Sequence, residues 1–162
     1  MNIYFSTSPN HTLQLLDHAL TCEFGITVRP EISRTTHGKP YFTDSDVHFN
    51  YSHCKYGSAC VIAKHEVGVD VQEICAIKPS VIKRVCCDNE LKVIQNDDDF
   101  IKMWTLKEAY AKFTGKGFAE GFKTIDTTKF SDKLVLKYDN LYIAYYAERF
   151  EEELKLVQVA PP

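Results

Sequence analysis

The spacing of apolar residues predicts a strand and then a helix at the start of the chain. Asn2–Phe5 is rich in apolar residues and is followed by Ser-Pro-Asn, which is typical of a strand that ends in a turn. Over residues 11–22 the apolar side chains recur at helical spacing and form one stripe, which consists of Leu13, Leu16, Ala19 and Leu20. Gly25 is placed either to end this helix or to turn the chain.

Three β-rich segments follow, over residues 47–53, 58–64 and 68–72. Short connections join them, and this predicts an antiparallel meander. In the third segment Asp70 and Gln72 alternate with two valines, so the period of a strand puts this polar pair on one face.

The second half of the chain shows helical patterns and then strands. Residues 80–95 predict one or two short helices. A longer amphipathic helix is expected to begin at Asp97–Asp99, whose acids suit the positive end of a helix dipole, and to end at Gly115. After it, strands are expected at residues 134–137, 142–146 and 154–159, with a hairpin turn at Asp139 and Asn140 between the first two. Together these elements predict an α+β fold.

Composition sets the size and the class of the protein. With 162 residues, of which 44% are hydrophobic, the chain can bury a core as one domain or as two small lobes. The formal net charge of -3 argues against bulk binding of nucleic acid. Residues 102–123 are nevertheless rich in lysine, so a local positive face can exist on an acidic protein.

The cysteines and the apolar runs bear on the cellular compartment. No Cys-x-x-Cys pair and no zinc-ligand spacing occurs, so the six cysteines are interpreted as free thiols or small core residues. The N-terminus does not have the pattern of a signal peptide, and no apolar run approaches the roughly 20 residues that cross a bilayer. We therefore expect a cytoplasmic protein that acts without a membrane.

Two acidic residues are the main candidates for chemistry. Asp70 lies in an otherwise apolar strand, where a carboxylate must sit at an edge, find a partner or hold a metal. Glu108 lies four residues after Trp104 and four before Lys112, so these three share one side of the helix, with Lys107 flanking. Each feature alone is most simply a structural or surface charge. Together, two carboxylates on rigid elements with lysines nearby indicate a divalent cation and a phosphorylated ligand.

Four segments carry a resemblance to a known family. They are Gly38–Tyr41, His48–His53, Gly68–Gln72, and Trp104–Lys112 with Gly115–Gly117. In order and spacing they resemble the signatures of 4'-phosphopantetheinyl transferases of the Sfp type, over residues 38 to about 125. The resemblance implies a two-lobed, pseudo-symmetric fold of antiparallel strands packed against helices, usually monomeric. Here the lobes would be residues 1–66, shortened, and residues 67–162, with self-association to complete the first lobe as the alternative.

The resemblance also implies an activity and a metal site. Members transfer 4'-phosphopantetheine from coenzyme A to a serine of an apo acyl or peptidyl carrier protein, releasing adenosine 3',5'-bisphosphate. Asp70 and Glu108 match the carboxylates that hold Mg²⁺, and Glu108 also matches the position of a group that accepts the serine proton. Gln72 stands where the family often has glutamate, so it would bind the metal directly or through water.

The remaining carried-over residues concern coenzyme A and the carrier protein. Lys107 and Lys112 would clamp the diphosphate, Ser52 and His53 would contact the 3'-phosphate, and Lys39 would join them. Lys116 either reaches the same phosphates or stays in solvent. Lys116 and Lys123 are also candidates for docking an acidic carrier protein.

Two other functions remain open. A non-catalytic module of the same fold would bind coenzyme A or a carrier protein, and Gln72 favours it. A metal-dependent nucleotide phosphohydrolase is the second, but the sequence offers no dedicated cluster to activate water.

Overall fold

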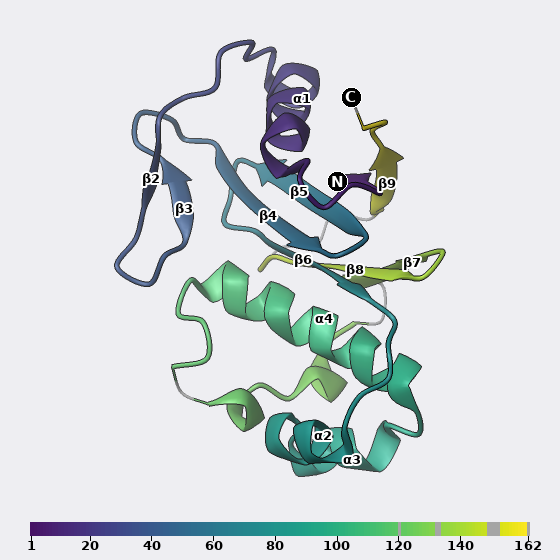
Figure 1. Ribbon diagram of the computed structural model, residues 1–162. Helices are drawn as coiled ribbons and strands as arrows, with labels where there is room; N and C mark the ends of the chain where they lie inside the picture. The colour runs from purple at the N-terminus through teal and green to yellow at the C-terminus, as the bar shows by residue number, and fades with distance from the viewer. Residues whose placement is uncertain (120, 132–133, 149–152, 162) are drawn as a thin grey trace.

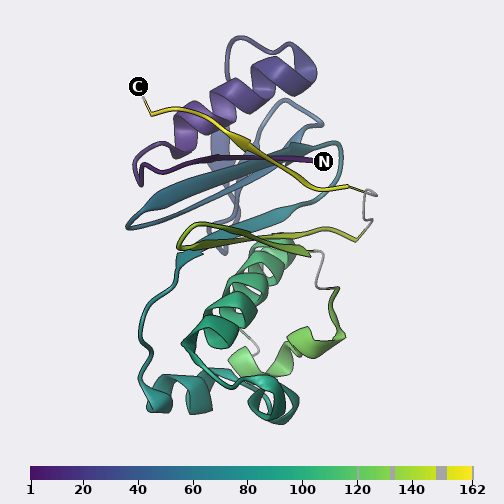
Figure 2. The same ribbon diagram turned by 90° about the vertical axis from the view of Figure 1, so that its right-hand side faces the viewer.

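The structure is a computed structural model that describes residues 1–119, 121–131, 134–148 and 153–161 (Figure 1). Figure 2 shows its elements stacked in layers, with one helix at one end and a group of helices at the other. No helix in these described stretches is long and apolar enough to cross a membrane.

The first sheet has the strand order β4-β5-β1-β9. Its strands are β1 (Asn2–Ser6), β4 (His48–Cys54), β5 (Gly57–Ala63) and β9 (Lys155–Gln158). β5 pairs antiparallel with both β1 and β4, whereas β9 pairs parallel with β1. Helix α1 (Thr12–Phe24) covers one face through Leu16 and Leu20, which pack with Phe49 of β4. Gly25 ends α1 in the left-handed conformation, as the sequence predicts.

The second sheet has the order β6-β8-β7 and lies against the other face of the first sheet. Its strands are β6 (Gly68–Glu73), β7 (Val135–Tyr138) and β8 (Leu141–Tyr146), all antiparallel. Residues of both sheets share one apolar cluster, for example Ile3, Val61, Val69 and Ile143. Helix α4 (Asp97–Thr114) packs on the outer face of this second sheet (Figure 1).

Smaller elements complete the two ends. Helices α2 (Pro79–Val85) and α3 (Asp88–Val93) and the 3₁₀ turns η1 (Phe122–Thr124) and η2 (Thr127–Lys129) pack beside α4. The short pair β2 (Ile32–Arg34) and β3 (Pro40–Phe42) flanks β4 and reaches toward the C-terminal end of α4.

The α+β class and most elements agree with the sequence predictions. Helix α4 begins at Asp97, with the Asn96 side chain accepting a hydrogen bond from the Asp99 amide, and ends at Gly115 in the left-handed conformation. The β7–β8 hairpin turns at Asp139, whose φ of 50° is left-handed.

The predicted meander is wrong for its third strand. β6 does not pair with β5 but with β8, some seventy residues later in the chain. The link from β6 to the first sheet is a side-chain bond: the Val69 amide of β6 donates a hydrogen bond to Asn50 Oδ1 of β4, at 3.0 Å. Adjacency in sequence favours pairing of neighbours, but β6 is covered by the first sheet on one face and by α4 on the other. The division into lobes at residue 66 stays a prediction. β9, from the predicted second lobe, pairs with β1 of the predicted first lobe.

Candidate active site at the contact between α4 and β6

One glycine sets how closely β6 approaches α4. A Cβ added to Gly68 would lie 2.1 Å from the Ala109 carbonyl oxygen and 2.5 Å from the Phe113 amide nitrogen. Only glycine therefore fits between this strand and this helix. Because strand residues alternate, Asp70 lies on the same face of β6 and points at α4.

Asp70 is 1% exposed, and its carboxylate is held by three neighbours. Oδ1 accepts hydrogen bonds from Ser52 Oγ of β4 at 2.6 Å and from Lys112 Nζ of α4 at 2.5 Å. Oδ2 accepts from Gln72 Nε2 at 2.9 Å, so the predicted sharing of one strand face by Asp70 and Gln72 is confirmed. We call Ser52, Asp70, Gln72, Glu108 and Lys112 the Asp70 site.

Glu108 brings a second carboxyl group to this site. Burial and then the negative charge of Asp70 raise the pKa of Glu108 to about 7, and the Lys112 ammonium only partly opposes them. Within the described part of the chain no hydrogen bond reaches its carboxylate. The site therefore holds more negative charge than one lysine neutralises. Oxygen donors with excess negative charge fit a hard divalent cation such as Mg²⁺.

A cavity of about 360 Å³ opens beside the Asp70 site. Arg34 and Lys39 line it from the β2–β3 segment, Asn50 from β4, and Glu108 and Lys112 from α4. Three cationic side chains around one opening favour a ligand with several phosphates. We call this opening the cation-lined cavity.

A larger hollow, of about 900 Å³, lies next to it. Lys39, Lys64 and Lys116 line it, together with Glu66. Lys39 Nζ bonds the Phe113 carbonyl oxygen at 2.7 Å and pairs with Glu66, so it joins the segment before β3 to the end of α4. Lys116 is exposed at this rim, and its role stays a prediction.

The prediction that Lys107 clamps phosphate is wrong. One residue along a helix turns the side chain by about 100°, so Lys107 points away from the side that carries Glu108. Its ammonium is fully buried and is bonded to Glu90 at 2.6 Å and to the carbonyl oxygens of Phe122 and Val85 at 3.0 and 3.2 Å. Every proton of this ammonium is used inside the protein.

Ser52 and His53, which the resemblance implies contact the 3'-phosphate together, have different surroundings. Neighbouring strand residues face opposite sides, so Ser52 is buried against Asp70 and Lys112 whereas His53 is exposed. Ser52 thus belongs to the Asp70 site. A contact between His53 and a ligand stays a separate prediction.

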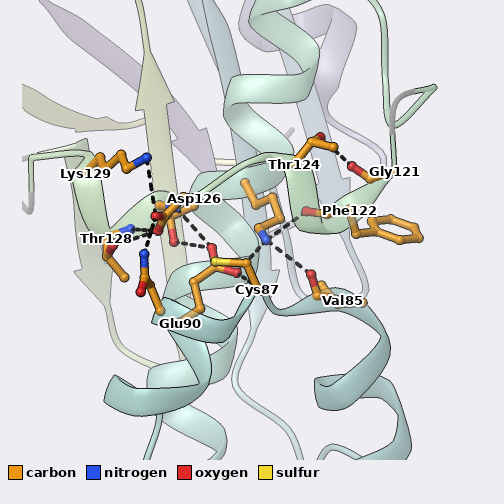
Figure 3. Close-up of polar contacts among 12 residues, drawn as sticks. Val85, Cys87, Glu90, Gly121, Phe122, Thr124, Asp126, Thr128 and Lys129 are labelled. Carbon is orange, nitrogen blue, oxygen red and sulfur yellow. Dashed lines mark hydrogen bonds and ion pairs between the residues drawn. The ribbon is translucent and has the colours of Figure 1, made fainter.

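A second group of possible metal ligands lies beside α3, and it is better explained as a structural network (Figure 3). One ligand atom each from Cys87, Glu90 and Asp126 falls within 4.8 Å of the others. Both oxygens of Glu90 already accept hydrogen bonds, from Lys107 and the Cys87 amide on one side and from Thr127 on the other. Asp126 likewise accepts from Asn89 and Thr128. These carboxylates are neutralised and bonded without a metal.

Sequence reasoning missed Asn50, which holds β6 in place. It is 3% exposed, and its Oδ1 accepts the Val69 amide proton one residue before Asp70. A buried asparagine in a strand must find a hydrogen-bond partner, and this signal was available in the segment His48–His53.

Comparison with known proteins adds to this geometry. The 4'-phosphopantetheinyl transferase superfamily matches residues 66–157. Among similar proteins, the 4'-phosphopantetheinyl transferase gsp of Aneurinibacillus migulanus is 36% identical over 90 residues, which are 52% of this chain and 38% of that protein. The 4'-phosphopantetheinyl transferase Sfp of Bacillus subtilis is 29% identical over 94 residues, which cover 54% of this chain and 42% of that protein.

A third relative, the 4'-phosphopantetheinyl transferase HetI of a Nostoc species, is 30% identical over 96 residues, or 51% of this chain and 40% of its own. The matched stretch thus spans about two fifths of the length of each relative. The superfamily match itself covers more than half of this chain and includes Asp70, Glu108 and Lys112. The chain therefore belongs to the 4'-phosphopantetheinyl transferase superfamily.

Proposed function

We propose that the protein transfers 4'-phosphopantetheine from coenzyme A to a serine hydroxyl of an apo acyl or peptidyl carrier protein, with Mg²⁺, and releases adenosine 3',5'-bisphosphate. The observation that carries this proposal is the pair of carboxyl groups, Asp70 and Glu108, beside the cation-lined cavity. The activity named for the relatives agrees with it.

The side chains of the site divide the work. Asp70 and Glu108 would hold Mg²⁺, with the Gln72 amide oxygen as a third ligand either directly or through water. When bound, Mg²⁺ supplies positive charge to the diphosphate oxygens as the bond breaks. Arg34, Lys39 and Lys112 line the cavity and would bind the phosphates of coenzyme A.

Proton transfer is assigned to Glu108. The Glu108 carboxylate would accept the serine proton, directly or through a water molecule. The serine oxygen then forms its bond to the β-phosphorus of coenzyme A as the bond from that phosphorus to the bridging oxygen breaks. Adenosine 3',5'-bisphosphate leaves with the electrons of the broken bond.

The site is built from one chain. Arg34 and Lys39 come from the first segment of the chain, Glu108 and Lys112 from α4, and together they enclose one cavity. We propose on this basis that the protein acts as a monomer.

The experiment that tests the function weighs the carrier protein. The purified protein is incubated with coenzyme A, Mg²⁺ and apo carrier proteins of the acyl and peptidyl types, and each carrier is measured by mass spectrometry. We expect a gain of one phosphopantetheine, and loss of that gain in Asp70→Asn and Glu108→Gln. Asp46→Asn, which changes an exposed acid paired with Lys64, serves as the matched control.

The same assay separates the other functions. Binding of coenzyme A or carrier without any mass gain would favour a non-catalytic module, which the neutral amide of Gln72 supports. Cleavage of coenzyme A when carrier is absent would favour a phosphohydrolase. Full transfer by Asp70→Asn would remove the assignment of the site.

A further inference from the structure

Asp70 already has a cation beside it, and that cation is a lysine. A buried carboxylate is costly unless a positive charge or hydrogen bonds compensate it. Lys112 Nζ lies 2.5 Å from Asp70 Oδ1 and 2.7 Å from Ser52 Oγ. The ammonium is therefore bonded to an oxygen that an incoming cation would need as a ligand.

Lys112 is partly exposed, so its ammonium has open space into which it can move. Its side chain is 29% exposed and lines the cation-lined cavity, whereas Asp70 is almost fully covered. A lysine head on a flexible stem can turn into such an opening while the stem stays packed. Lys107, five residues earlier, has no such freedom, because its side chain is 0% exposed and its ammonium is bonded to three acceptors.

Two hydrogen bonds besides that of Lys112 hold the Asp70 carboxylate. Ser52 donates its proton to Oδ1, and Gln72 holds Oδ2 independently of the lysine. These two bonds would keep the carboxylate oriented at α4 if its cationic partner changed.

We propose that Lys112 is an exchangeable counter-ion: it leaves Asp70 when a divalent cation binds there, and its ammonium then turns into the cation-lined cavity toward anionic groups. In naming phosphates as those anionic groups the inference rests on the proposed function, but the exchange itself requires no catalysis. Loading of the metal and binding of an anionic ligand are then coupled through one side chain.

The first test measures the chemical reactivity of the lysine amines in the unaltered protein. The protein is reductively methylated without divalent metal and with Mg²⁺ at matched ionic strength, and each lysine is quantified by peptide mass spectrometry. We expect the reactivity of Lys112 to rise with Mg²⁺. Lys107 stays unreactive and Lys116 stays reactive in both conditions, because one is fully buried and the other exposed.

The second test measures Mn²⁺ binding by electron paramagnetic resonance without coenzyme A. Lys112→Met removes the competing ammonium, so we expect Mn²⁺ to bind about tenfold more tightly, a typical size for coupling between two ligands. Lys116→Met removes a nearby charge that does not touch Asp70, and we expect a much smaller change. Equal effects of the two substitutions, or weaker binding in Lys112→Met, would overturn the exchange.

The outcomes also separate this inference from the proposed function. If Asp70→Asn abolishes Mn²⁺ binding but the reactivity of Lys112 does not respond to Mg²⁺, the exchange is wrong and the transferase site stands. If Asp70→Asn leaves Mn²⁺ binding unchanged, both are wrong.

Discussion

At the scale of single residues, the raised pKa of Glu108 links the stability of the protein to pH. Its pKa, about 7 against an ordinary value of 4.5, means that the folded protein holds this proton more tightly than the unfolded chain does. The stabilising effect is complete below pH 4.5 and is lost as the pH rises through 7. Without divalent metal, we expect the free energy of unfolding to contain a term that falls between about pH 4.5 and pH 7.

Urea denaturation of the metal-free protein across this pH range measures that term. In Glu108→Gln the side chain cannot ionise, so the decline should be shallower than in the unaltered protein. Parallel pH profiles for the two proteins would show that the pKa of Glu108 is not raised in the folded protein.

Gln72 is the residue at which this site departs from the pattern that the resemblance implies. Gln72→Glu adds a carboxylate next to Asp70, so we expect tighter Mg²⁺ binding and a lower Mg²⁺ requirement for transfer. The same change removes the hydrogen bond from Nε2 to Asp70 Oδ2 and places two like charges together. Without metal, we expect a loss of about 1–3 kcal/mol in unfolding free energy.

A Mg²⁺ titration of transfer and a metal-free urea titration check the two halves of this prediction. An unchanged or higher Mg²⁺ requirement would mean that Gln72 does not face the metal.

Residue patterns predicted part of the site. Asp70, Glu108 and Lys112 could be selected because one strand period and one helix turn place their side chains. Lys107 could not be assigned in this way. Spacing says which residues share a side of a helix, but only packing shows that the Lys107 side meets Glu90.

At the scale of elements, the contact between β6 and α4 depends on the absence of a side chain at Gly68. Gly68→Ala would force the strand away from the helix backbone, and we expect a loss of about 1–3 kcal/mol in unfolding free energy. Because Asp70 lies two residues further on, we also expect transfer to fall by about 100-fold in protein that remains folded.

Gly25→Ala is the matched control. Gly25 has a left-handed φ of 66° and open space around its Cβ position, at the end of α1. Its substitution should cost about 1–2 kcal/mol by strain alone and leave transfer unchanged. Comparable activity of the two variants would argue against the close contact as the device that positions Asp70.

The ion pair of Lys107 and Glu90 joins the small helices to α4. Burial raises the pKa of Glu90, but hydrogen bonds from Lys107, Thr127 and the Cys87 amide outweigh burial and leave it below its usual value. Removing one partner leaves a buried charge, so Lys107→Met should cost about 3–5 kcal/mol.

A double-mutant cycle with Glu90→Gln measures the coupling. We expect the double variant to lose clearly less stability than the sum of the two single variants. Transfer by folded Lys107→Met should persist. If transfer is abolished while stability is unchanged, Lys107 binds the phosphates of coenzyme A after all.

At the scale of the whole molecule, the layers are set by pairings between distant segments. β9 returns to lie beside β1, and β6 pairs with β8. Local patterns predicted the helices and the hairpin at Asp139 well, because turns and helix ends depend on a few adjacent residues. They do not reveal which strand edges meet across much of the chain, so the third strand of the meander was misplaced.

These long-range pairings bring the β2–β3 segment, β4, β6 and α4 around one opening, and the function depends on that convergence. The most direct measurement is anomalous diffraction from crystals of the protein with coenzyme A and Mn²⁺. We expect a Mn²⁺ peak about 2 Å from carboxylate oxygens of both Asp70 and Glu108. A peak beside Cys87 and Asp126 instead, or none beside Asp70 while coenzyme A is bound, would contradict it.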